Sequence, residues 1–232
     1  MTTTRRRRTS PFALRLSVEI VDLNFRIWRE LEVLLSAPLH ELHETLQVAF
    51  GWTNSHLYAF ELDGRTYMAP YVEQEDLDDP TLDASAVTLQ ELGLTKGSRL
   101  VYEYDLGDSW RHQIDVVGDD VALPWLFYPR CVGGQRAAPP EDSGGTTGFE
   151  DLLAALADPT DEEHESSRIW VGDDYDPLRF DQDAINVRLA AWWGRRSHFA
   201  AQTGKRHFAF DQVEWLALAD LENEGESPPW LS

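Results

Sequence analysis

The sequence predicts an α+β fold: a β-grasp-like mixed sheet covered by helices, with a C-terminal helical extension. Three patterns support this prediction. Apolar residues alternate with polar residues near the N-terminus, one amphipathic helix pattern follows, and two hairpin patterns come after it. A β-β-α-β-β order with a short turn before the last strands is what a sheet with one helix on one face requires.

Two strands and a helix are expected in the first unit. From Phe12 to Ile20 every second residue is apolar, which is the period of a half-buried strand. A second alternating run over residues 25–33 can pair with it as a hairpin. Ser36 is the expected N-cap of a helix with Pro38 in its first turn, and Gly51 is expected to end that helix.

Two hairpins are expected next. Asp63-Gly64, a strong hairpin signal, separates the strands of the first, and residues 106–109 separate the strands of the second. Between the hairpins we expect a mobile acidic loop at 73–83 and a short helical turn at 88–92. The four expected strands span residues 56–62, 65–69, 99–105 and 110–117.

Helices are expected to dominate the rest of the chain. Short helices over 148–157 and 182–193, the second capped by Asp181, are separated by a polar linker at 161–167, and another helix is expected over 211–221. The expected organisation is a disordered Arg-rich tail (1–11), the α+β domain (12–193), and a C-terminal helical extension with a polar tail (194–232).

Charge restricts the class of partner. The chain carries 41 Asp and Glu against 20 Lys and Arg, and its net charge of −21 repels a phosphate backbone. A protein partner of basic character, or cations, fits this charge better than nucleic acid does. Nucleic-acid binding is expected only at a local basic patch, for which the best candidates are Arg195, Arg196, Lys205 and Arg206.

Cysteine content and hydropathy exclude further classes. The single cysteine, Cys131, excludes an internal disulfide framework and a CxxC-type zinc site. No apolar run approaches the roughly 18 residues that a membrane span needs. The run from Arg5 to Arg8 is not followed by an apolar stretch, so it is not a signal peptide, and a cytoplasmic protein is expected.

Residues 129–153, PRCVGGQRAAPPEDSGGTTGFEDLL, are rich in residues that restrict the backbone. Because Pro fixes φ and Gly permits φ above zero, we expect a loop with a required shape. Such loops serve a site or an interface more often than a mere connection.

The strongest candidates for metal ligands are His56, Asp105, Asp108 and His112, a set that Glu141 and Asp142 can extend. Asp105 and Asp108 bracket a tight hairpin, so their carboxylates can converge, and His112 lies on an otherwise apolar strand face, where an imidazole needs a partner. Such a set suits zinc, manganese or iron. The alternative is structural: the Asp side chains cap their own turn, and His112 is a core histidine bonded to one of them.

Asp108, Glu141 and Asp142 are the candidates for catalytic residues. Adjacent carboxylates can raise one pKa, which would make Glu141 and Asp142 an acid/base pair. Alternatively, both favour the N-terminal dipole of the helix that follows. His40 and His43, three residues apart on the first helix, are expected on a solvated face.

Other chemistries find little support. Cys131 and Ser143 have no histidine near them in the sequence to activate a nucleophile. The Gly-rich segment has no phosphate-loop pattern, so no nucleotide or organic cofactor is expected, whereas a divalent metal remains open.

Four segments together carry a family resemblance. They are LHELHETLQVAFGWTNSHLYAF (39–60), YEYDLGDSWRHQIDV (102–116), PRCVGGQRAAPPEDSGGTTGFEDLL (129–153) and FDQDAINVRLA (180–190). In this order they resemble the plasmid pRiA4b ORF-three-like family, whose members are often described as passenger proteins of mobile elements. The resemblance implies an α+β domain common on plasmids and in bacterial genomes, and it implies no established activity.

The chain departs from the family pattern at two positions. Relatives often carry cysteines where this chain has Ala138 and Ser143. A cysteine-based metal site in relatives, if one exists, cannot operate unchanged here.

Two functions remain open. The favoured one is a non-enzymatic binding module that engages a protein partner through a sheet edge or the Pro/Gly loop. The other is a metal-dependent hydrolase, conceivably a nuclease, built on the His/Asp set. Convergence of these His and Asp side chains in the folded chain would favour the hydrolase.

Overall fold

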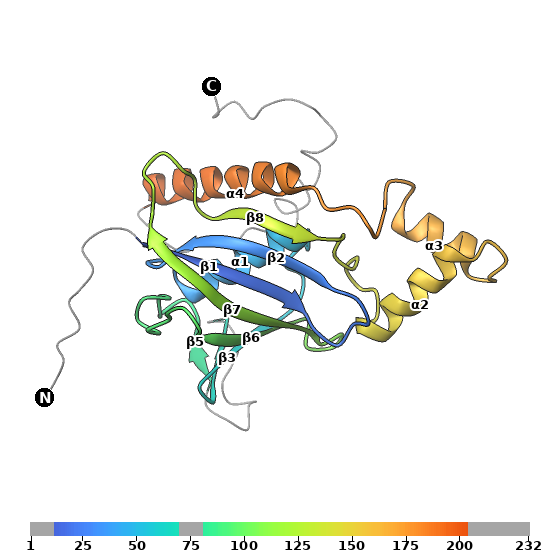
Figure 1. Cartoon of the computed structure of the whole chain (residues 1–232), viewed down its shortest axis with the longest axis horizontal. Coiled ribbons are helices and arrows are strands. Elements are labelled where there is room, and N and C mark those ends of the chain that lie inside the picture. Colours follow the sequence, from blue (N-terminus) through green and yellow to red (C-terminus); the bar gives the residue numbers. More distant parts are fainter. Residues whose placement is uncertain (1–11, 70–80, 204–232) are drawn as a thin grey trace, which may run out of the picture.

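The computed structural model describes residues 12–69 and 81–203, which contain one eight-stranded sheet and four helices (Figure 1). The strands are β1 (Phe12–Ile20), β2 (Ile27–Leu34), β3 (Tyr58–Leu62), β4 (Arg65–Met68), β5 (Leu82–Asp83), β6 (Arg99–Tyr104), β7 (Trp110–Val121) and β8 (Arg130–Gln135). The helices are α1 (Leu39–Phe50), α2 (Gly145–Ala157), α3 (His164–Val171) and α4 (Gln182–Thr203).

The strand order is β5-β4-β3-β6-β7-β1-β2-β8. Neighbouring strands are antiparallel except β4 and β5, which are parallel, so the sheet is mixed. The α+β prediction is therefore confirmed. The expected hairpin around Asp63-Gly64 also forms, as β3 and β4.

The alternation in β1 fixes which face of the sheet is buried. Leu14, Leu16 and Val18 are at most 1% exposed, because they belong to the core that also contains Leu42 and Leu46 of α1. Figure 1 shows α1 behind this part of the sheet and α4 alongside β8.

Helix α1 is buried on all sides. All 12 of its residues are buried, because it belongs to the sheet's core on one side and contacts α4 on another. Gly51 ends the helix in the left-handed conformation as predicted, whereas the N-cap is Pro38 and not Ser36. The prediction that His40 and His43 lie on a solvated face was wrong.

Three further boundaries differ from the predictions. The segment 161–167 is not only a linker, because α3 begins at His164. Strand β8 forms within the segment expected to be a loop, and α4 continues past residue 193 to Thr203. The expected tail (1–11), most of the acidic loop and the helix over 211–221 lie outside the described residues. Among the described helices, none is long and apolar enough to cross a membrane.

Candidate functional site

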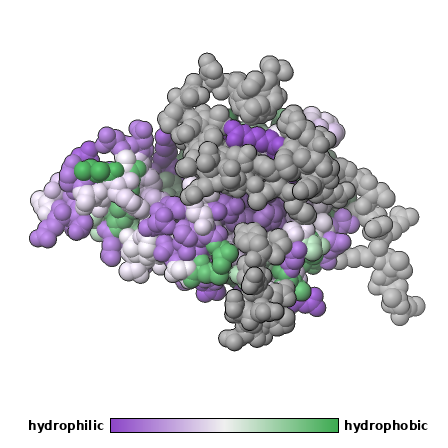
Figure 2. Space-filling model, turned by 180° about the vertical axis from the view of Figure 1, so that it is seen from behind, coloured by the Kyte–Doolittle hydropathy of each residue, from purple (hydrophilic) through white to green (hydrophobic). Residues whose placement is uncertain are grey.

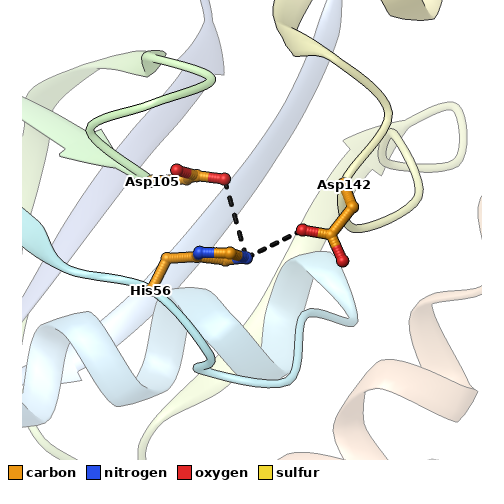
Figure 3. Close-up of side chains that lie close together, drawn as sticks. All are labelled: His56, Asp105 and Asp142. Carbon is orange, nitrogen blue, oxygen red and sulfur yellow. Dashed lines mark hydrogen bonds and ion pairs between the residues drawn. The ribbon is translucent and has the colours of Figure 1, made fainter.

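His56, Asp105 and Asp142 meet at one point of the molecule (Figure 3). His56 lies between α1 and β3, Asp105 follows β6, and Asp142 lies in the loop before α2. The Nε2 atom of His56 is 2.9 Å from Oδ1 of Asp142 and 3.6 Å from Oδ2 of Asp105. Among the side chains of residues 12–69 and 81–197, no other three from His, Cys, Asp or Glu bring their ligand atoms within 4.8 Å of one another.

Asp105 both shapes its turn and faces His56. Its Oδ1 accepts hydrogen bonds from the backbone N–H groups of Gly107 (3.0 Å) and Asp108 (3.3 Å), while its Oδ2 points to the imidazole. The residue has a φ of 55°, a conformation in which Asp is tolerated because its short side chain bonds locally. The carboxylate of Asp105 therefore does both: its Oδ1 caps the turn and its Oδ2 faces His56.

Asp108 joins the turn to the loop before α2. Its Oδ2 accepts a hydrogen bond from the N–H of Gly144 at 3.0 Å. A Cβ at Gly145, where φ is +67°, would lie 2.5 Å from the carbonyl oxygen of Asp108. The Gly-Gly pair is thus needed for a close backbone approach, and the approach holds Asp142 near Asp105.

Glu141 anchors the same loop from inside. It accepts hydrogen bonds from the N–H (2.6 Å) and hydroxyl (2.9 Å) of Thr53 and from the hydroxyl of Tyr104. Burial, reinforced by the Glu141 charge, raises the pKa of Tyr104 well above its usual value, so this phenol stays a donor. Glu141 and Asp142, for which an acid/base pair was one of two interpretations, bond to different partners: Glu141 to Thr53 and Tyr104, Asp142 to His56.

The backbone carbonyl groups of both prolines in the loop also accept hydrogen bonds. The carbonyl oxygen of Pro139 accepts a hydrogen bond from the indole N–H of Trp52 at 3.0 Å, and that of Pro140 accepts one from the Ser143 hydroxyl at 2.8 Å. The shape of the Pro/Gly loop therefore serves to hold Asp142 against His56. Ser143 hydrogen-bonds within the loop and no base accompanies it among its described contacts.

His112 lies apart from this group. It is fully buried, its Nδ1 is 2.9 Å from the carbonyl oxygen of Trp110, and its ring meets Phe50 and Trp52 edge-on. Burial lowers the pKa of His112 to about 3, which keeps the imidazole neutral. It is a core histidine, as the structural alternative anticipated, but its described partner is a carbonyl group and not a carboxylate.

A second group of polar side chains is buried around α1. It consists of residues of α1 and of their partners on neighbouring elements. His43 bonds the Tyr102 hydroxyl through Nδ1 (2.8 Å) and the Asn54 side-chain oxygen through Nε2 (2.7 Å), and it stacks on Tyr58. Burial lowers the pKa of His43 well below its usual value. Sequence reasoning missed His43 although it lies at helical spacing from Leu39, Leu46 and Phe50, on the face that packs against the sheet.

Arg196 belongs to this buried group. Its guanidinium bonds Glu44 and lies 3.1 Å from Glu41, and the residue is only 6% exposed. The candidate basic patch therefore loses Arg196 to an interior ion pair, while Lys205 and Arg206 lie outside the described residues. Trp192 and Arg196 are four residues apart, so extending the helix pattern beyond residue 193 would have placed both on one buried face.

The single cysteine of the chain is unsuited to act as a nucleophile or a metal ligand at the site. Cys131 lies in β8, and its thiol donates to the carbonyl oxygen of Gly133 at 3.3 Å. Burial raises its pKa, which disfavours the thiolate. The donors available at the site are thus one imidazole and two carboxylates, a set that suits a divalent transition metal.

Comparison with known proteins places this fold in a family. The chain is 34% identical over 189 residues to the uncharacterized protein y4hQ of Sinorhizobium fredii, an alignment that covers 79% of this chain and 95% of that protein. The crystal structure of a protein of unknown function, MM3350 from Methanosarcina mazei, superimposes with a TM-score of 0.68 at 30% identity, covering 75% of this chain and 96% of that one. Residues 12–184 match the pattern of the plasmid pRiA4b ORF-3-like proteins, and the chain belongs to that family.

Proposed function

We propose that the chain is a metal-dependent hydrolase that holds a divalent transition metal with His56, Asp105 and Asp142. The observation that carries this proposal is the convergence of one imidazole nitrogen and two carboxylate oxygens within 4.8 Å. Atoms that bind one metal ion at about 2.0–2.2 Å are also close to one another, as these three ligand atoms are. Zinc, manganese and iron accept this mixture of nitrogen and oxygen donors.

The site is open enough for catalysis. The side chains of His56 and Asp142 are 32% and 71% exposed, whereas that of Asp105 is 12% exposed and fixed by its turn. A divalent metal held by His56, Asp105 and Asp142 would activate a water molecule for attack near neutral pH. Asp108 and Glu141 act as positioning residues, because both carboxylates already accept hydrogen bonds from the protein.

Two observations weigh against the surfaces first considered for a binding module. The side chain of Asn186 bonds both the N–H and the carbonyl oxygen of Cys131 in β8, at 2.8 and 2.9 Å, so this part of the sheet edge is occupied. The Pro/Gly loop bonds inward, as described above. A nuclease is also disfavoured, because Arg196 is buried and the net charge is −21.

The first test is the metal content of untagged protein purified without chelator, measured by elemental mass spectrometry. We expect about one zinc, manganese or iron per chain, and loss of the metal in the variants His56→Gln and Asp142→Asn. The matched controls are His164→Gln and Asp151→Asn, which make the same chemical changes in α3 and α2.

Hydrolysis is tested on the metal-loaded protein with p-nitrophenyl esters and p-nitrophenyl phosphate. Turnover that requires metal and disappears in Asp142→Asn, but not in Asp151→Asn, would support the proposal. A folded protein that takes up none of these metals would refute it and leave His56 in a plain hydrogen-bonded group. A protein that binds metal without turnover on either substrate would contradict the hydrolase assignment and leave a metal-binding protein.

A further inference from the structure

Helices α2 and α3 form an arm at one end of the molecule, away from α1 and α4 (Figure 1). None of the eight residues of α3 is buried. The helix is attached to α2 on one side, where Nδ1 of His164 lies 2.9 Å from the carbonyl oxygen of Ala155. Its other side faces solvent.

The solvent side of α3 is apolar near the C-terminal end of the helix. Ile169 is 74% exposed and Trp170 is 51% exposed, and the two residues are adjacent. Trp170 and Val171 line a pocket of about 330 Å³ towards α4, and Val171 also lines a pocket of about 370 Å³ towards α2. We call this region, Ile169 and Trp170 with the two pockets beside Val171, the α3 surface. Solvated Ile and Trp side chains next to hollows are typical of an interaction site.

The surroundings of the α3 surface are strongly acidic. Eight Asp and Glu lie between residues 158 and 176, against a single Arg, and all eight are exposed. That arginine, Arg168, is already engaged by Asp173 (3.0 Å) and Glu165 (3.5 Å). Figure 2 shows hydrophobic atoms among hydrophilic ones at the end of the molecule that α2 and α3 form.

We propose that the α3 surface binds a basic amphipathic segment of a partner protein. Apolar side chains of that segment pack on Ile169 and Trp170 and enter the two pockets, while its Lys and Arg side chains face the acidic rim. A second copy of this chain is a poor occupant, because it would bring two acidic rims together. The proposal is independent of the metal site, which involves none of these residues.

The test uses a fluorescein-labelled helical peptide of about four turns, with Leu on one face and Lys on the other. Fluorescence anisotropy measures its affinity for the full chain and for the double variant Ile169→Ser/Trp170→Ser. The matched control is Trp125→Ser/Phe127→Ser, which removes two other exposed aromatic side chains, 73% and 62% exposed. Circular dichroism verifies that each variant is folded.

We expect the α3 variant to bind at least about tenfold more weakly and the control variant to bind within about threefold of the original chain. Binding should also weaken with salt, and peptides with Glu in place of Lys or Ser in place of Leu should not bind. Equal weakening in both variants, or binding that depends on Lys alone, would overturn the proposal in favour of unspecific charge attraction. A dimer in sedimentation equilibrium that Ile169→Ser/Trp170→Ser dissociates would overturn it in favour of a second copy.

Discussion

The interior around α1 and the loops around His56 contain the same kinds of side chain in different states. Around α1, His43 and Glu44 are at most 1% exposed and bond to other buried groups. In the loops around His56, the imidazole faces two carboxylates and remains partly exposed. Both regions combine imidazoles with carboxylates, so residue type alone does not separate them.

Burial and partner chemistry make the difference. In the interior, loss of hydration opposes charge: the pKa of His43 is lowered and that of Glu44 is raised to about 8. These groups therefore hold the fold together as hydrogen-bonded pairs. In the loops around His56, water can reach the same kinds of group, so substitutions there should change the free energy of unfolding little. Four predictions test this contrast, from the largest effect to the smallest.

The largest effect is expected for Arg196→Ala, because it leaves Glu41 and Glu44 buried without their cation. Above pH 8, where Glu44 is ionised, breaking this buried ion pair costs about 3–5 kcal/mol in the free energy of unfolding. The matched control is Arg168→Ala, which breaks exposed pairs worth about 0–1 kcal/mol. Urea denaturation measures both. Equal losses would mean that α4 does not depend on this interior pair.

Gly145→Ala should destabilise the fold by more than about 2 kcal/mol, because it combines a φ of +67° with a Cβ 2.5 Å from the carbonyl oxygen of Asp108. Gly51→Ala is the control: its φ is +80° but no atom lies within 4 Å of the new Cβ, so about 1 kcal/mol is expected. Thermal unfolding compares the two. If Gly145→Ala costs no more than Gly51→Ala, the close approach that positions Asp142 is unimportant.

The pH dependence of stability should have two opposed contributions. Burial raises the pKa of Glu44 from 4.5 to about 8, so its stabilising contribution is complete below pH 4.5 and is lost as pH rises towards 8. Burial lowers the pKa of His112 from 6.5 to about 3, so its contribution is complete above pH 6.5 and is lost as pH falls towards 3.

Each group contributes a slope of at most about 1.4 kcal/mol per pH unit. Urea unfolding of Glu44→Gln, in which Arg196 keeps Glu41 as a partner, should show a flatter decline between pH 4.5 and 8 than the original chain. Parallel curves for the two proteins would show that Glu44 does not titrate in this range.

The smallest effect on stability is expected for a substitution in the loops around His56. His56→Gln should change the free energy of unfolding by no more than about 0.5 kcal/mol in metal-free protein, because the side chain is one-third exposed and holds no core contact comparable with that of His43. Equilibrium denaturation in the presence of chelator gives this value. A loss as large as that of Arg196→Ala would make His56 a structural residue and erase the contrast between the two regions.

Local patterns predicted the elements that depend on local chemistry. The alternation in β1, the left-handed Gly51 and the Asp63-Gly64 hairpin all form as expected, because each depends on neighbouring residues. Strand β8 was missed because Gly133 and Gly134 are poor strand formers. Its pairing with β2 and with the Asn186 side chain compensates for that weakness.

The candidate site was predicted in part. His56 and Asp105 do meet, but the hairpin spacing pointed to Asp105 together with Asp108, whose carboxylate bonds to Gly144 instead. His112 faces inward, as strand periodicity requires, but periodicity gives no information on its partner. Asp142, predicted only as an addition to the His/Asp set together with Glu141, reaches His56 because Glu141 and Gly145 fix the path of its loop.

The sequence by itself determined the α+β class, most elements of the sheet, the acidic surface and the family. Tertiary structure alone decided which of the five histidines with described side chains are buried in the interior and which of these five faces two carboxylates. The reason is that burial and charge environment depend on segments distant in the chain. His56 and Asp142 are 86 residues apart, and Glu44 and Arg196 are 152 residues apart. No local pattern carries information across such separations, whereas packing of the sheet, α1 and α4 brings these groups together.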